Sequence, residues 1–141
     1  MTAPPPAWSY ATLKEIAAVL ADTADGLTGS EIGDLLARLR MEDPMPGVTK
    51  RDRLTEAFVA RQNTDGSAKR IVTFIVRAME PVRYRDRPEL FTLRQDRLNE
   101  RLAFVGLHVN DKGEVAHGAR AQTLNEATRI ATSIRAELQR R

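Results

Sequence analysis

Residues 69–81 read KRIVTFIVRAMEP, and this stretch decides how the fold is interpreted. Its centre, from Ile71 to Val76, is dense in β-branched side chains, which is typical of a strand. The polar residues nevertheless recur at helical spacing and leave one narrow polar stripe. They are Arg70, Thr73, Arg77 and Glu80. A helix that is apolar on every other side is normally buried, so we predict a central, almost wholly buried helix that ends at Pro81.

A second helix is expected to begin at Pro88, because proline is favoured at the first helical position. Asp86 is the expected N-cap residue of this helix. Between the two helices three arginines cross the surface, namely Arg83, Arg85 and Arg87. The second helix has an apolar stripe formed by Phe91, Leu98, Leu102 and Val105. Another face of the same helix carries a basic stripe at spacings of three and four residues. It is formed by Arg94, Arg97 and Arg101.

Helix-start signals mark the rest of the chain. Side-chain hydroxyls are expected to cap four further helices, at Ser9, Thr28, Thr49 and Thr123. Thr28 and Thr123 are each followed three residues later by a glutamate, which is the spacing of a capping box. The inward face of the last helix is predicted to consist of Leu124, Ala127, Ile130, Ile134 and Leu138.

A short hairpin is expected near residues 107–116, after Gly106 ends the fifth helix. Gly113 would supply the left-handed residue that such a turn requires. The predicted fold is therefore mostly α, with about six helices in a compact bundle and one small β-hairpin. Residues 1–8 are proline-rich and are expected to form a disordered tail. Residues 9–141 are expected to form a single helical domain, with room for a soft sub-boundary near residues 81–88.

Composition excludes several classes of protein. The chain has 141 residues, no cysteine and two histidines, which excludes a disulfide framework and a cysteine-based zinc site and argues against a histidine-rich one. No run approaches the roughly 18 apolar residues of a membrane-spanning helix. The N-terminus lacks the basic and apolar regions of a secretory signal. We therefore expect a cytoplasmic protein with no membrane contact, no metal and no cofactor.

The net charge of +3 is unevenly distributed along the chain. Residues 1–68 carry 7 basic and 10 acidic side chains, a net charge of −3, whereas residues 69–101 carry 9 and 5, a net charge of +4. The basic residues are 18 arginines and 4 lysines. Arginine suits phosphate and carboxylate recognition. Acidic residues are interleaved with nearly every cluster, however, so a solvated surface accounts for the arginines as well.

No catalytic pattern stands out in the sequence. There is no glycine-rich phosphate loop and no nucleophile elbow, so we predict no enzymatic activity and assign no catalytic residue. One pair keeps a ribonuclease alternative open. Arg101 and His108 are separated by six residues, which nominally fits the R-x4–6-H signature of HEPN ribonucleases. In those enzymes both residues lie in one helical region, whereas here Gly106 is expected to end the helix between them.

The basic stripe and the hairpin turn are the candidate partner-binding surface. Its predicted residues are Arg94, Arg97, Arg101, Asn110 and Lys112. Because Asp96 and Glu100 lie beside the stripe, intrahelical ion pairs explain the arginines without a partner. A protein-binding surface, in which arginine is a frequent anchor, and an RNA-binding surface are the two functional interpretations.

Three segments of the chain resemble the N-terminal domain of bacterial abortive-infection proteins of the AbiJ N-terminal-domain kind. They are QNTDGSAKRIVTFIVRAMEPVRYRDRPELF, RLNERLAFVGLHVNDKGEV and AQTLNEATRIATSIRAEL. The resemblance covers about residues 28–141. Its most specific positions are Phe74, Ile75, Met79, Pro81, Arg83 and Tyr84 in the first segment, Leu98, Asn99, Leu102, Phe104, Gly106 and Leu107 in the second, and Thr123, Leu124, Glu126 and Ala127 in the third.

The resemblance implies a regulatory role. In that group the domain usually precedes a HEPN-like effector domain that acts on RNA in phage defence. It implies a sensing, regulatory or assembly function for this part, and it implies no catalytic residue here. The expected partners are a HEPN-like effector domain or another defence protein, with self-association and RNA as further options. The alternative function is a nucleic-acid-binding module that uses the arginine face, and the third is a HEPN-type ribonuclease.

Overall fold

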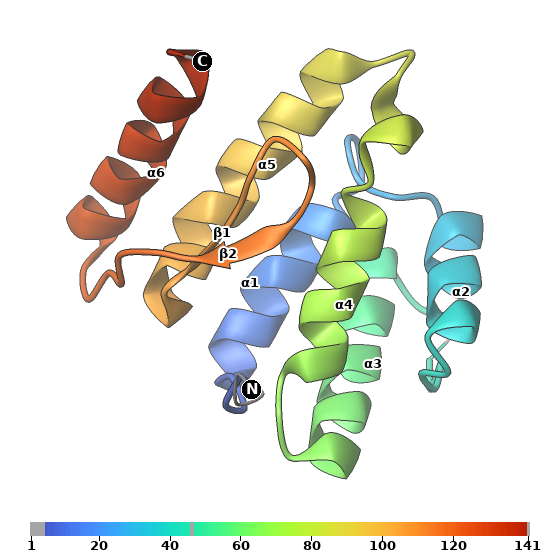
Figure 1. The fold of residues 1–141 in the computed structure, drawn as a ribbon. Helices are drawn as coiled ribbons and strands as arrows, with labels where there is room; N and C mark the ends of the chain where they lie inside the picture. The colour runs from blue at the N-terminus through green and yellow to red at the C-terminus, as the bar shows by residue number, and fades with distance from the viewer. Residues whose placement is uncertain (1–4, 46, 141) are drawn as a thin grey trace. The chain divides into compact units, whose positions relative to one another are not determined.

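The computed structural model describes residues 5–45 and 47–140, over which the chain forms six α-helices and one antiparallel hairpin (Figure 1). The predicted fold class, mostly α with one small hairpin, is confirmed. The chain divides into two compact units, of which the first ends at Ala78 and the second begins at Met79. This division lies just before the segment from Pro81 to Pro88, where the sequence left room for a soft sub-boundary.

The helices of the first unit begin where the sequence predicts a cap or a helical pattern. They are α1 (Tyr10–Leu20), α2 (Gly29–Arg38), α3 (Lys50–Asp65) and α4 (Lys69–Ala78). The predicted capping box at Thr28 is present. The Thr28 hydroxyl accepts from the N–H of Glu31 at 3.1 Å, and the Glu31 carboxylate accepts from the N–H of Thr28 at 2.8 Å. Ser9 and Thr49 cap α1 and α3 through their hydroxyl oxygens, as predicted.

α4 is a helix and not a strand, as its polar stripe predicts. Its buried face consists of Ile71, Phe74, Ile75 and Ala78. The ring of Phe74 meets that of Phe58 on α3 edge-on, with the centroids 5.2 Å apart and the planes at 80°, which is a favourable geometry for an aromatic pair. α3 lies beside both α1 and α4 (Figure 1). The core of this unit therefore includes the contact of α3 with α1 and its contact with α4.

The predicted disordered tail is wrong for Trp8. This side chain is only 5% exposed, because burying its large apolar surface outweighs the flexibility of the preceding prolines. The side-chain amide of Gln62 on α3 binds the backbone of Trp8 twice: the Trp8 N–H donates to Oε1 at 2.8 Å, and Nε2 donates to the Trp8 carbonyl at 2.8 Å. The Pro5 carbonyl also accepts from the N–H of Ala68 at 3.3 Å. Residues 1–4 of the predicted tail lie outside the described residues.

The second unit consists of two long helices and several short elements. They are the 3-10 turn η1 (Pro81–Tyr84), α5 (Pro88–Leu102), the 3-10 turn η2 (Ala103–Val105), β1 (Leu107–Val109), β2 (Val115–His117) and α6 (Leu124–Gln139). The strands pair antiparallel, with His108 opposite Ala116. Gly106 and Gly113 both adopt the left-handed conformation, with φ of 70° and 77°. Both glycines therefore act as predicted, one ending the helical segment and one in the hairpin turn.

The structure contradicts the sequence predictions for Asp86 and Leu124. The N-cap of α5 is Arg87 and not Asp86, and no side chain caps this helix end. A residue directly before proline is held out of the helical conformation, so Arg87 takes the boundary position before Pro88. The second error is Leu124, which is 80% exposed. It lies at the first position of α6, and the buried residues of this helix are Ala127 and Ala131.

Candidate functional site

A buried polar cluster on α5 binds the hairpin of the second unit. Asn99 holds the backbone of Val109 on β1 from both sides: its Oδ1 accepts from the Val109 N–H at 2.7 Å, and its Nδ2 donates to the Val109 carbonyl at 3.2 Å. One helical turn earlier, Gln95 Nε2 donates to the same carbonyl and to the carboxylate of Asp111, each at 3.1 Å. Gln95 is 0% exposed and Asn99 2%. The hairpin is therefore fixed to α5 through its backbone.

The same cluster extends to α6 through Arg135. Its Nε and Nη2 donate to Oδ1 of Asp96 at 3.0 and 2.9 Å, and Nη2 also donates to Oε1 of Gln95. Gln95 thus binds the hairpin with its nitrogen and α6 with its oxygen. α5, the hairpin and α6 are joined in one network, which we call the Gln95 network (Gln95, Asp96, Asn99 and Arg135). The sequence analysis missed it, although Gln95 and Asn99 at i and i+4 beside an apolar stripe were a usable signal.

The hairpin turn that this network supports is itself ordered by Asn110. The Asn110 side-chain oxygen accepts from the N–H groups of Lys112 and Glu114 at 2.9 and 3.0 Å, which is a turn motif typical of asparagine. Lys112 is exposed at the tip and Asn110 is half-buried. The structure therefore brings these two predicted site residues together in one turn.

The arginine stripe of α5 is less exposed than the sequence predicts. Arg97 and Arg101 are half-buried, and Nη1 of Arg101 donates to the Arg97 carbonyl at 3.0 Å. Arg101 also lies 3.8 Å from the carboxylate of Glu100. Arg94 is 5% exposed, so the prediction that it contributes to an exposed face is wrong. Of the three arginines, only Arg97 and Arg101 reach the surface in part.

Arg94 is buried because it binds Tyr84. Its Nη1 donates to the Tyr84 hydroxyl at 2.6 Å, and its guanidinium carbon lies 5.3 Å from the centre of the Tyr84 ring. The same hydroxyl donates to the sulfur of Met79 at 3.4 Å, and the ring meets Phe91 edge-on at 5.3 Å. A cation over an aromatic face with a charge-assisted hydrogen bond is a strong combination in a buried place. Arg94 thus supports η1 and does not face a partner.

Arg101 and His108 lie on different elements, which was the expected obstacle to a HEPN interpretation. Arg101 is in the last turn of α5, whereas His108 is on β1, and η2 and Gly106 separate them. His108 is half-buried, and burial lowers its pKa below the ordinary value of 6.5. Its Nδ1 has no hydrogen-bond partner among the described residues, and Gly118 lies against its ring.

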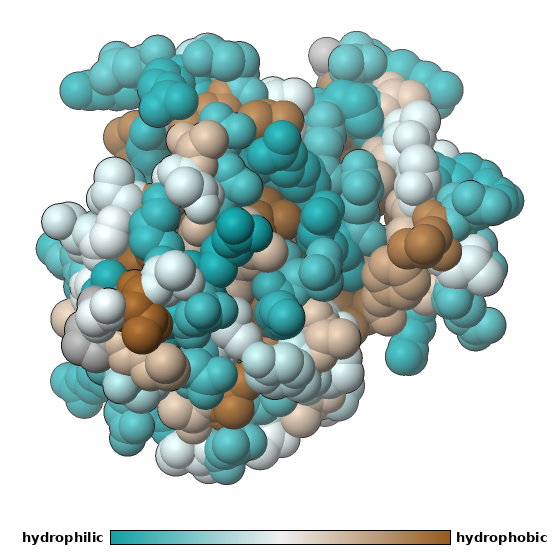
Figure 2. All heavy atoms as spheres, turned by 180° about the vertical axis from the view of Figure 1, so that it is seen from behind, coloured by the Kyte–Doolittle hydropathy of each residue, from teal (hydrophilic) through white to brown (hydrophobic). Residues whose placement is uncertain are grey.

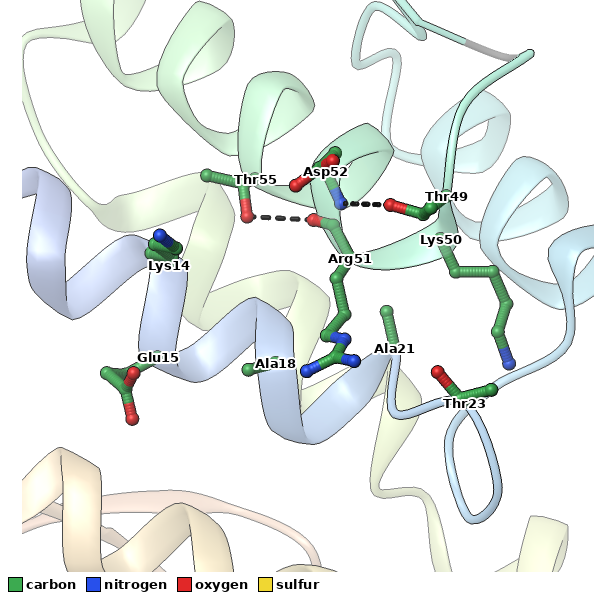
Figure 3. A pocket seen from close by; sticks show the side chains of 10 residues that line it. All are labelled: Lys14, Glu15, Ala18, Ala21, Thr23, Thr49, Lys50, Arg51, Asp52 and Thr55. Atoms are coloured by element: carbon green, nitrogen blue, oxygen red, sulfur yellow. Dashed lines mark hydrogen bonds between the residues drawn. The ribbon is translucent and has the colours of Figure 1, made fainter.

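The first unit contains a pocket of about 550 Å³ between α1 and the start of α3 (Figure 3). In Figure 3 the side chain of Arg51 extends toward Ala18, whereas that of Lys50 points toward Thr23. Nζ of Lys50 donates to the backbone carbonyls of Asp22 and Leu27, at 3.1 and 2.9 Å, so this lysine connects the loop after α1 to α3. The charged side chains that line the pocket are Lys14, Glu15, Lys50, Arg51 and Asp52. This mixture favours no single sign of charge in a ligand.

Several large apolar side chains are exposed among the described residues. The large exposed ones are Tyr10, Met45, Val48, Val82, Leu93 and Leu124. On the face drawn in Figure 2 the apolar side chains form small separate groups among polar ones. Within residues 5–45 and 47–140, no helix is long and apolar enough to cross a membrane. The same residues hold no cluster of three or more histidines and carboxylates that could bind a metal ion.

Comparisons of the chain with protein-family models, with curated proteins and with solved structures found no match.

Proposed function

We propose that this chain is a non-catalytic regulatory, sensing or assembly module of a bacterial phage-defence system of the abortive-infection kind, acting in the cytoplasm through protein–protein contact. Two things support the proposal. One is the resemblance of the three segments to the abortive-infection group. The other, which carries most weight, is the Gln95 network, which fixes a turn in which Lys112 is exposed.

A fixed turn favours a binding role for a physical reason. Association costs the conformational freedom of every side chain and loop that becomes ordered at the interface. Here the hairpin backbone is already held by Asn99 and Gln95, and the turn is held by Asn110. A partner of Lys112, Arg97 and Arg101 would therefore meet a surface that is ordered before binding. The exposed Lys112 and the half-buried Arg97 and Arg101 of α5 suit the polar rim of a protein interface.

The proposed partner is a HEPN-like effector domain or another defence protein, or a second copy of this chain. A nucleic-acid-binding module is the second candidate function. It is favoured by the exposure of Arg83 in η1 and of Arg85 and Arg87 between η1 and α5, since exposed arginines neutralise phosphates.

Charge reversal at the turn separates the two functions. The variant Lys112→Glu changes an exposed tip residue and should leave the fold intact, as circular dichroism would confirm. We expect it to weaken binding to a purified HEPN-like effector domain, measured by calorimetry. The matched control is Arg129→Glu, which reverses an exposed cation on α6. The same measurements with RNA and DNA oligonucleotides at about 50 and about 200 mM salt complete the design. Micromolar nucleic-acid binding that falls steeply with salt would replace the first function by the second.

A further inference from the structure

The residues from 81 to 88, here named the arginine turn, are exposed with a single exception. Pro81, Val82, Arg83, Arg85, Asp86, Arg87 and Pro88 are all exposed, and only Tyr84 is buried, at 4%. The side chains of Arg85 and Asp86 are 78% and 88% exposed. Val82 is 67% exposed, which is high for a large apolar side chain. Short exposed segments are usually the least ordered parts of a protein, so what holds this segment in place matters.

The buried side chain of Tyr84 fixes the arginine turn to the rest of the second unit. Its hydroxyl accepts from Arg94 and donates to the sulfur of Met79, and its ring contacts Phe91 and the Arg94 guanidinium. Arg94, which the sequence predicted on the binding surface, therefore fixes the arginine turn through Tyr84. Burying an arginine costs side-chain entropy and desolvation of its charge. Its use beneath an exposed loop indicates that the loop's conformation is important.

The hairpin supports the turn from a second side. Gly113 lies so close that a Cβ atom at this position would overlap the Met79 carbonyl oxygen and lie 3.3 Å from Cδ of Pro81. The arginine turn therefore begins against the turn that the Gln95 network holds. Lys112, the residue next to Gly113, is exposed at this place. The arginine turn and the hairpin tip are neighbouring parts of the second unit.

We propose that the arginine turn is the principal contact surface for a protein partner whose face offers carboxylates around a small apolar contact. This inference rests on the proposed function and deepens it, since it places the contact at Val82, Arg85 and Arg87 in place of the α5 stripe. The guanidinium groups of Arg85 and Arg87 would bind the carboxylates in the two-pronged geometry that arginine favours. The exposed side chain of Val82 would be buried by the apolar contact.

The composition of the turn favours a protein over a nucleic acid. A phosphate backbone presents negative charge throughout, and the exposed carboxylates of Asp86 and Glu89 would repel it. A protein face can place a donor opposite Asp86 and acceptors opposite its arginine neighbours. Val82 adds apolar surface that a phosphate backbone cannot use. These three features together fit a mixed protein surface.

Photo-crosslinking tests where the partner binds. Position 82 is replaced by the photoreactive residue p-benzoylphenylalanine in one variant, position 112 in a second, and position 129 on α6 in a control. Each full-length variant is expressed in the native host cell and irradiated, and the adducts are identified by mass spectrometry. The expected result is a protein adduct from position 82 that is absent from position 129. The captured protein is then purified, and its binding to Arg85→Glu/Arg87→Glu is expected to be about tenfold weaker or worse, whereas Arg129→Glu binds like the parent.

The remaining outcomes separate this inference from the proposed function. A protein adduct from position 112 without one from position 82 overturns the inference and leaves the proposed function standing. Equal binding of the captured protein by the parent and by the Arg85/Arg87 variant also overturns it. Adducts to nucleic acid alone from position 82, or no adduct from either 82 or 112, overturn both the inference and the proposed function. All substituted side chains are exposed, so the variants are expected to keep the fold. Circular dichroism of each variant checks this.

Discussion

Gly113 and Met79 are in such close contact that no other residue type fits at position 113 without movement. A Cβ atom there would overlap the Met79 carbonyl oxygen and lie 3.0 Å from its carbonyl carbon. The φ of Gly113 is also 77°, in the left-handed region where side chains are strained. Both costs fall on one residue, and they meet where the hairpin supports the arginine turn.

Gly113→Ala should therefore destabilise the protein by about 2 kcal/mol or more, measured by urea denaturation. Two controls separate the causes. Gly66 has a φ of 68° with nothing within 4 Å, so Gly66→Ala should show the strain alone, about 1 kcal/mol. Gly47 has neither strain nor a near neighbour, so Gly47→Ala should change stability by less than about 0.5 kcal/mol. Equal losses at 113 and 66 would show that the Met79 contact is unimportant.

Phe74→Ala should cost about 3–5 kcal/mol of unfolding free energy. The Phe74 side chain is fully buried and meets Phe58 edge-on, so its removal leaves a cavity in the core of the first unit. Chemical denaturation measures the loss, and Tyr10→Ala, which removes a ring that is 57% exposed, is the control. A change below about 1 kcal/mol for Phe74→Ala would place this ring outside the core.

Asn99→Ala should destabilise the protein by about 1–3 kcal/mol, because the buried N–H of Val109 then lacks its acceptor. Urea denaturation gives the loss, and the Val109 amide should shift in an NMR spectrum. Asn125→Ala on the exposed surface of α6 is the matched control. If the two alanine variants were equally stable, Asn99 would not be what fixes the hairpin.

Asp43 is expected to make the stability of the first unit depend on pH in the acid range. A hydrogen bond from Arg53 lowers the pKa of Asp43 below its ordinary value of 3.8. The carboxylate accepts from Nε and Nη2 of Arg53 at 2.9 and 2.6 Å. A carboxyl group with a lowered pKa stabilises the folded state above the unfolded pKa, and that stabilisation is lost as the pH falls through the folded pKa.

Asp43→Asn should therefore be less stable than the parent at pH 7, by about 1 kcal/mol because the Asp43 side chain is 29% exposed. The difference should shrink as the pH falls below 3.8. Thermal melts at a series of pH values test this. The control Asp34→Asn breaks a pair whose side chains are 73% and 55% exposed, and its effect should stay below about 0.5 kcal/mol. A difference for Asp43→Asn that is constant down to the acid limit would contradict the proposed origin.

The purified protein should not cleave RNA. Arg101 and His108 lie on different elements with Gly106 between them, whereas the HEPN signature places both in one helical region. Incubation with structured and unstructured RNA, followed by gel electrophoresis, is the measurement. Cleavage by the parent that His108→Ala abolishes would support the ribonuclease alternative.

Local signals predicted most of the fold. The polar stripe of α4, the hydroxyl caps at Ser9, Thr28 and Thr49, and Gly113 each act within a few residues, where spacing and backbone preference are decisive. The error at Asp86 is also local, since it comes from the proline at position 88, whereas the error at Trp8 depends on a residue far away in sequence. Trp8 is held by Gln62, which is 54 positions away, and no local pattern contains that pairing.

The candidate site was harder to predict for the same reason. Arg94 has the spacing of an exposed stripe, and only the position of Tyr84 ten residues earlier shows that it is buried. The exposure of Val82 likewise depends on how Tyr84 fixes η1. The apolar character of Val82 alone does not predict that its side chain is exposed. Asn110 and Lys112 were placed correctly in one turn because an asparagine side chain that binds the backbone two residues on is a local motif.

The Gln95 network also sets an order in which the second unit comes apart. The buried residues of α6 are Ala127 and Ala131, Ile130 is partly buried beside them, and Arg135 joins the helix to α5. The contact of α6 rests on small buried side chains, so we expect α6 to open at a lower free energy than the hairpin, in a local unfolding step that precedes the global one. Gln95 would lose the donor to its oxygen in that step but keep both contacts to the hairpin through its nitrogen. The arginine turn and its support would thus outlast the C-terminal helix, and amide hydrogen exchange should be fastest along α6.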